Sequence, residues 1–253
     1  MSVAYSDRNK KLLEKSSVFM GYLPAGYPDR QKFISLLESC CKLGMDIAEV
    51  GFPAKDPFAD GEVIRRAHKA IDYSVTADMD YWRAIRACCP NPLWVMGYLS
   101  DLTEGGVYRK LADEGVVDAF VIPGCDDDTF AKMRDELAPC KVDMVRLVSP
   151  RDDAEKLRKY FKYDTFIYYQ LFNGPTGSNQ ATEDYTQMLS IAKEYDNLRV
   201  LAGFGVNTPM QVRQLLDGGF DGITIGTAMV KKLNISEKNL LDFVEEIANE
   251  TRS

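Results

Sequence analysis

Two carboxylates, Glu49 and Asp60, are the residues whose type and spacing point most directly to chemistry. Glu49 lies within the apolar run 47–51, and Asp60 follows eleven residues later, after a loop that contains Pro53 and Pro57. Because burying an ionised carboxylate without a partner is costly, a glutamate in such a run is protonated, with a raised pKa, or paired. Two carboxylates that face one pocket suit acid–base chemistry, one held protonated by apolar surroundings and the other ionised.

Each carboxylate also has a purely structural interpretation. Asp60 stands directly before a predicted helix that starts at Gly61, where it would cap the helix N-terminus, and capping can coexist with catalysis. Glu49 would alternatively be a buried glutamate bonded to backbone groups. Strand alternation puts Glu49 on the same face as Ile47 and Gly51, so it points at a ligand if that face lines a barrel mouth.

Strands and helices alternate along the whole chain. Strand-like apolar runs are predicted at 18–22, 47–51, 93–98, 119–122, 144–148, 165–169, 199–202 and 222–225. Helical patterns are predicted at 6–15, 31–42, 61–71, 78–88, 104–114, 128–138, 152–160, 182–195, 208–217 and 237–250. Such alternation is typical of parallel strands joined by right-handed crossovers.

We therefore predict an α/β fold, a (β/α)8 TIM barrel that spans residues 1–253 as a single domain with a short extra helix at its N-terminus. The 253 residues match the roughly 250 typical of this fold. A glycine followed closely by an aspartate leads from helix to strand three times, at 44–46, 115–118 and 219–221. A repeated hinge fits a closed barrel better than an open sheet, and a doubly wound sheet is the structural alternative.

The composition disfavours several classes of function. A net charge of −7 disfavours nucleic acid or an anionic membrane as the main partner, since both need a basic face. No apolar run approaches the ~18 residues of a membrane span and no signal peptide is apparent, so we expect a soluble cytoplasmic protein. The only histidine, His68, is expected to pack or to lie on the surface. Because metal-dependent aldolases need clustered histidines, a single histidine disfavours that class of enzyme. None of the predicted strands carries the interior lysine of a Schiff-base aldolase.

Glycines gather where the loops after the later strands are expected. Gly177 follows the sixth strand, the run 203–205 follows the seventh, and Gly226 with Thr227 follows the eighth, just before a short helix. Glycines let backbone N–H groups approach an anion, and a helix N-terminus adds a positive dipole end. Each glycine alone could be only a turn, but together they predict a phosphate site at the working end of the barrel.

The runs 48–53, Ala-Glu-Val-Gly-Phe-Pro, and 56–64, Asp-Pro-Phe-Ala-Asp-Gly-Glu-Val-Ile, resemble the signature of the tryptophan synthase alpha chain family, whose catalytic pair is a glutamate and an aspartate eleven residues apart. Further matches follow in chain order at 24–28, 96–98, 174–177, 203–206 and 221–227. The resemblance implies a cofactor-free retro-aldol cleavage of indole-3-glycerol phosphate to indole and glyceraldehyde 3-phosphate, in tryptophan biosynthesis.

The resemblance also implies a role for each matching residue. Glu49 would protonate the indole carbon, Asp60 would take up the indole N–H proton, and Thr176 would help to position Asp60 when the loop closes. The other implied substrate contacts are Tyr22 and Met96 against the indole, Tyr168 near the reacting centre, and Gly177, Gly205, Gly226 and Thr227 around the phosphate.

Three loops depart from the family pattern. The runs 122–126 and 98–101 replace Pro-Asp-Leu-Pro and Tyr-x-Asn-Pro, and Phe172 stands where the family has an arginine. The resemblance implies that some of these loops belong to the face that meets a tryptophan synthase beta subunit. The departures therefore concern docking to that possible partner. Two alternatives stay open: a stand-alone lyase acting on this or another phosphorylated aryl-glycerol, and a catalytically silent partner protein.

Overall fold

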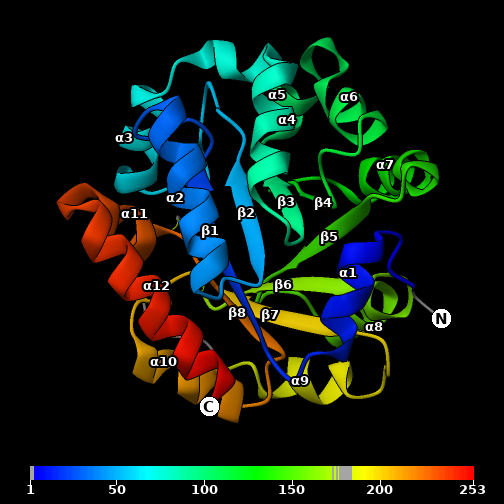
Figure 1. The fold of residues 1–253 in the computed structure, drawn as a ribbon. Helices are drawn as coiled ribbons and strands as arrows, with labels where there is room; N and C mark the ends of the chain where they lie inside the picture. The colour runs from blue at the N-terminus through cyan, green and yellow to red at the C-terminus, as the bar shows by residue number, and fades with distance from the viewer. Residues whose placement is uncertain (1–2, 173, 175, 177–183) are drawn as a thin grey trace.

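The computed structural model describes residues 3–172, 174, 176 and 184–253. Eight parallel strands pair in chain order and close into a barrel, since β8 pairs back onto β1 (Figure 1). The strands are β1 (Val18–Pro24), β2 (Ile47–Gly51), β3 (Leu93–Met96), β4 (Ala119–Val121), β5 (Asp143–Val148), β6 (Phe166–Gln170), β7 (Arg199–Gly203) and β8 (Gly222–Ile225). The predicted TIM barrel and all eight predicted strands are confirmed, and the doubly wound alternative is wrong.

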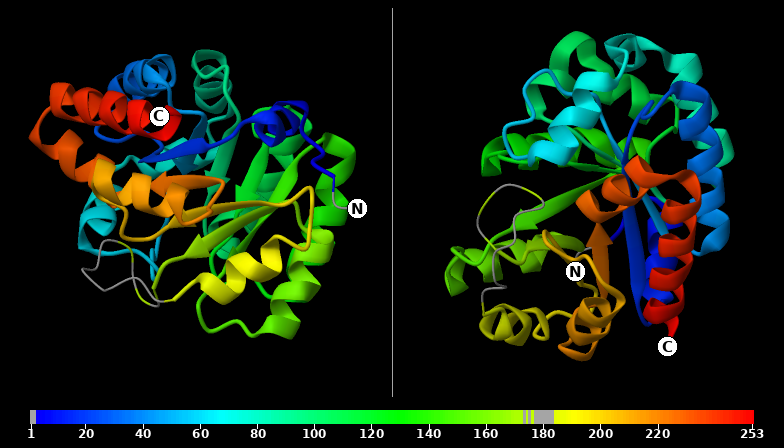
Figure 2. Two further views of the ribbon diagram at one scale, coloured as in Figure 1. Left: turned by 90° about the horizontal axis from the view of Figure 1, so that it is seen from below. Right: turned by 90° about the vertical axis from the view of Figure 1, so that its left-hand side faces the viewer.

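Helices surround the barrel on its outside (Figure 2). They are α1 (Asp7–Lys10), α2 (Arg30–Leu43), α3 (Glu62–Ala70), α4 (Met79–Cys88), α5 (Leu99–Thr103), α6 (Val107–Asp113), α7 (Asp127–Leu137), α8 (Ala154–Tyr163), α9 (Thr186–Ala192), α10 (Pro209–Asp217), α11 (Thr227–Ile235) and α12 (Glu237–Arg252). The last helix, α12, packs beside α2 and α11, so the C-terminal helix lies next to the first helix that follows β1. Within the described part of the chain, no helix is both long and apolar enough to span a membrane.

Short elements account for most of the differences from the predicted helices. The helix predicted at 6–15 is divided into α1 and a 3-10 turn at Lys11–Glu14. Neither α5 nor the 3-10 turn Tyr73–Ala77 was predicted, because five residues are too few for a helical hydrophobic repeat to show. The helix predicted at 182–195 is observed as α9, and residues 182 and 183 lie outside the described residues.

The strand register brings polar side chains to the working end of the barrel. On neighbouring parallel strands, Tyr22 of β1 is the register partner of Glu49 of β2. Every residue of both strands is buried, so an inward-facing position on either strand meets only other side chains and the cavity. The register therefore places a tyrosine directly beside the glutamate.

The opposite end of the barrel is closed by α1. Asn9 is fully buried and donates its side-chain amide to Asp143 at 2.8 Å and to the backbone carbonyl of Asp118 at 3.0 Å. Its carbonyl oxygen accepts the indole N–H of Trp94 at 2.9 Å. One asparagine thus joins the first turns of the chain to the beginnings of β3, β4 and β5.

Replacing Asn9 with alanine should lower the free energy of unfolding by about 2–4 kcal/mol, because it leaves Trp94 and Asp143 short of buried hydrogen-bond partners. Urea unfolding followed by circular dichroism measures this loss. The exposed Asn197, changed to alanine, serves as the control and should stay within about 0.5 kcal/mol of the unmodified protein. Equal effects of the two substitutions would contradict the role given to Asn9.

Candidate functional site

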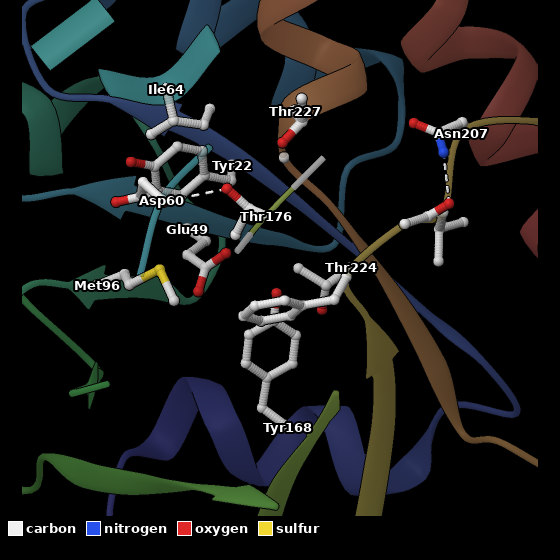
Figure 3. A pocket seen from close by; sticks show the side chains of 14 residues that line it. Tyr22, Glu49, Asp60, Ile64, Met96, Tyr168, Thr176, Asn207, Thr224 and Thr227 are labelled. Atoms are coloured by element: carbon white, nitrogen blue, oxygen red, sulfur yellow. Dashed lines mark hydrogen bonds between the residues drawn. The ribbon is translucent and has the colours of Figure 1, made fainter. Parts of the chain in front are cut away.

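A cavity of about 460 Å³, open space at its mouth included, lies at the carboxyl ends of the strands. Of the ten residues that the sequence assigned to the site, Gly177 lies outside the described residues and the other nine all line this cavity (Figure 3): Tyr22, Glu49, Asp60, Met96, Tyr168, Thr176, Gly205, Gly226 and Thr227.

Glu49 is the most deeply buried carboxyl group of the cavity, with 1 % of the residue exposed. Its Oε1 atom has no hydrogen-bond partner among the described residues, so bonding to the backbone does not explain its burial. Burial, and secondarily the charge of Asp60, raises the pKa of Glu49 to about 8. At neutral pH Glu49 therefore holds a proton, and its carboxyl group points into the cavity, between Asp60, Met96 and Tyr168 (Figure 3).

Asp60 is held by two hydroxyl groups from other loops. Tyr98, which follows β3, donates to its Oδ2 at 2.7 Å, and Thr176 donates to its Oδ1 at 3.3 Å. Burial raises the pKa of Asp60, while both hydrogen bonds and the charge of Arg65 oppose that rise. The structural alternative for Asp60, an N-cap of this helix, is wrong: α3 begins at Glu62 with Gly61 as its N-cap, and the Asp60 carboxylate faces the cavity.

Thr176 joins the loop after β6 to the loop that carries Asp60. Its hydroxyl accepts the N–H of Gly61 at 3.0 Å, and its own N–H donates to the carbonyl of Ala59 at 3.2 Å. A β-carbon at Gly61 would lie 2.0 Å from the Thr176 carbonyl oxygen, so only glycine allows this approach. The backbone contacts therefore hold the two loops together, and the Thr176 hydroxyl orients the Asp60 carboxylate.

The far side of the cavity is built from backbone rather than from charged side chains. Gly205 has a φ of 97°, a conformation that favours glycine, and Gly226 is the N-cap of α11. Thr227 begins that nine-residue helix, whose first N–H groups have no partner within the helix. Such a cradle suits an anion of the size and charge of phosphate.

Aromatic and apolar side chains complete the wall between the carboxylates and this cradle. The rings of Tyr168 and Phe204 lie 5.8 Å apart, and Phe172 meets Phe204 edge-on at 6.2 Å. Phe172 is fully buried, so the position where the family has an arginine serves packing in this chain. In the part of the chain that the structure describes, no cluster of three or more His, Cys, Asp or Glu side chains could hold a metal ion.

Several lining residues were not assigned from the sequence. They are Ile64, Phe204, Val206, Asn207 and Thr224, with Tyr98 binding Asp60 from beside the cavity. Tyr98 had a signal, because it ends the family-like run 96–98. Thr224 had the same kind of signal, because it lies within the family-like run 221–227, but residue type alone does not tell an inward threonine from an outward one in a short strand.

Comparison with known proteins identifies the family. The family model described as tryptophan synthase alpha chain matches residues 9–252. The chain belongs to the tryptophan synthase alpha chain family. Membership in this family implies a lyase, and it confirms the resemblance seen in the runs 48–53 and 56–64.

Individual alpha chains and solved structures agree with this family. The alpha chain of Phenylobacterium zucineum is 30 % identical over 228 residues, covering 87 % of this chain and 82 % of its own length. That of Petrotoga mobilis is 26 % identical over 250 residues, covering 96 % of each chain. A chain of Mycobacterium tuberculosis tryptophan synthase superposes with a TM-score of 0.84 at 25 % identity, covering 98 % of this chain and 99 % of that one.

The raised pKa of Glu49 makes stability depend on pH in a defined direction. Its ordinary value is 4.5, so between about pH 5 and 8 the unfolded chain has released a proton that the folded protein keeps. The contribution of Glu49 to stability therefore falls as pH rises through this window, by up to about 1.4 kcal/mol per pH unit.

Replacing Glu49 with glutamine should remove this contribution, because the amide does not titrate. Relative to the unmodified protein, the variant should gain stability steadily in urea unfolding measured at pH 5, 6.5 and 8. The same substitution at Glu155, which is exposed on α8, should give no such trend. A constant difference at all three pH values would mean that Glu49 titrates as an ordinary glutamate.

Proposed function

We propose that this protein cleaves indole-3-glycerol phosphate to indole and glyceraldehyde 3-phosphate by carboxylate acid–base catalysis. The observation that carries the proposal is the pair of buried carboxyl groups, Glu49 protonated and Asp60 hydrogen-bonded, in one cavity with a backbone cradle suited to phosphate. Membership in the tryptophan synthase alpha chain family supports it.

In this reaction Glu49 gives its proton to the indole carbon that bears the glycerol chain. Positive charge builds on the ring, and Asp60 takes up the indole N–H proton as it does so. The carbon–carbon bond then breaks, its electrons return to the ring, the indole nitrogen takes its proton back from Asp60, and the adjacent hydroxyl group becomes the aldehyde. The proton that this hydroxyl loses returns to the Glu49 carboxylate, which restores the starting state.

The remaining cavity residues bind and orient the substrate. Gly205, Gly226 and Thr227 would hold the phosphate, while Tyr22, Met96 and Tyr168 would contact the indole and the reacting carbon. Anchoring the phosphate at the end of the cavity away from the carboxylates would place the bond to be broken beside Glu49. Positioning of this kind supplies much of the rate enhancement of an enzyme.

Glu49→Gln and Asp60→Asn should each lower kcat for indole release by about 10²–10⁴-fold, because each removes one proton-transfer group and little volume. Asp56→Asn is the matched control, since Asp56 is an exposed aspartate of the same loop and should leave the activity of the chain alone unchanged. Indole formed from indole-3-glycerol phosphate is the measurement. Near-normal turnover by Glu49→Gln or Asp60→Asn would disprove the assigned mechanism.

We further propose that a tryptophan synthase beta subunit docks beside the Asp60 loop. Phe58 in this loop is 56 % exposed, and its ring lies 4.6 Å from that of Tyr98, the residue that binds Asp60. A partner that covers Phe58 would therefore act on the position of Asp60. A solved structure described as a tryptophan synthase complex, from Pyrococcus furiosus, shares the fold, with a TM-score of 0.79 at 24 % identity over 93 % of this chain and 99 % of that one.

Adding a beta subunit and serine should increase indole-3-glycerol phosphate cleavage at least several-fold over the chain alone. Phe58→Asp should reduce the ratio of the two activities, because a charge replaces the exposed ring. Met210→Asp, at an exposed apolar residue on α10, should leave this ratio unchanged. Activity without any stimulation would favour the stand-alone lyase instead.

A further inference from the structure

The only histidine of the chain is buried beside the cavity rather than exposed. His68 of α3 is 7 % exposed, and both of its ring nitrogens have partners. The backbone N–H of Ala54 donates to Nδ1 at 3.3 Å, and the hydroxyl of Tyr22 lies 3.2 Å from Nε2. Packing was expected for this residue, but a polar link to a predicted site residue was not.

These two contacts determine where the protons lie. A backbone N–H can only donate, so Nδ1 of His68 must be the acceptor and the single proton of the neutral ring must be on Nε2. Nε2 therefore donates to the oxygen of Tyr22. Burial lowers the pKa of His68 to about 4, which agrees with a neutral ring at neutral pH.

The Tyr22 hydroxyl then has its own proton left to donate. A β-carbon at Gly51 would lie 2.3 Å from the Tyr22 oxygen, so the hydroxyl occupies the space that this glycine leaves open. Gly51 lies on the same face of β2 as Glu49, two residues further toward the cavity mouth. No other hydrogen bond of this hydroxyl occurs among the described residues, and Tyr22 lines the cavity next to Asp60.

We propose that His68 is a positioning residue, which holds the Tyr22 hydroxyl so that its proton faces the cavity as a donor to negative charge that develops there. With the other tautomer, Nε2 would accept the tyrosine proton and turn it away from the cavity. Ala54 belongs to the loop between Glu49 and Asp60, so that loop selects the working tautomer. This inference rests on the proposed lyase function for its catalytic part.

The tautomer can be tested without any activity, because the chain contains a single histidine. Long-range ¹H–¹⁵N spectra of the untagged full chain should show one imidazole that is neutral and protonated on Nε2 from pH 5.5 to 8. Tyr22→Phe should shift mainly the Nε2 signal. A ring protonated on Nδ1, or an imidazolium at pH 5.5, would overturn the proposal whether or not the protein cleaves indole-3-glycerol phosphate.

A double-mutant cycle tests the catalytic part. Tyr22→Phe and His68→Leu should each lower kcat about ten-fold with KM changed less than three-fold, and the double variant should be no worse than Tyr22→Phe alone. His68→Gln should recover most of the loss, since its amide N–H can replace Nε2–H. Lys69→Ala, on the exposed face of α3, is the control and should match the unmodified protein.

The outcomes separate the two proposals. If the unmodified protein releases no indole, the proposed function fails while the spectra still decide the tautomer. Suppose instead that the unmodified protein is active. If His68→Leu then lowers kcat by the same factor whether residue 22 is Tyr or Phe, His68 acts through the fold rather than through the Tyr22 hydroxyl, and the inference is wrong. Full activity of the Tyr22→Phe variant would likewise contradict it.

Discussion

The structure of the working end depends on keeping a carboxyl group protonated inside a protein barrel. Glu49 keeps its proton at neutral pH because apolar and aromatic walls exclude water and because a second carboxylate, Asp60, lies close enough to disfavour another negative charge. The two groups thereby have different protonation preferences within one cavity. Acid–base chemistry requires such a difference, and it costs stability that the rest of the barrel has to supply.

Asp60 lies on a loop, and loops are held in position by what they touch. Hydroxyl groups from the loops after two other strands, Tyr98 and Thr176, bind the two oxygens of its carboxylate. The glycine after Asp60 permits the close approach of the Thr176 backbone. Hydrogen bonds to the carboxylate also favour its ionised form, so the contacts that orient Asp60 also tune its charge.

The two ends of the barrel have different roles: the closed end stabilises the fold, and the open end carries the candidate site. At the closed end, Asn9 joins α1 to the beginnings of three strands through fully buried hydrogen bonds. At the open end, Glu49 keeps an oxygen without a partner among the described residues, which is tolerated because a ligand or a transferred proton can use it. Barrels of this type carry their active sites at the carboxyl ends of the strands, and the polar groups of this chain follow that division.

The eight strands, the barrel and the carboxylate pair were predictable from the sequence, because hydrophobic alternation and short motifs are local properties. Contacts between distant segments were not. Tyr98 binds Asp60 across 38 positions, Thr176 binds it across 116, and the hydrogen bond between Tyr22 and His68 spans 46. Residue types alone also left open a role for Asp60 as a helix cap, although its carboxylate turns to the cavity. Only the closed barrel, which brings the ends of all the strands to one place, decides which polar groups meet and which proton each of them presents.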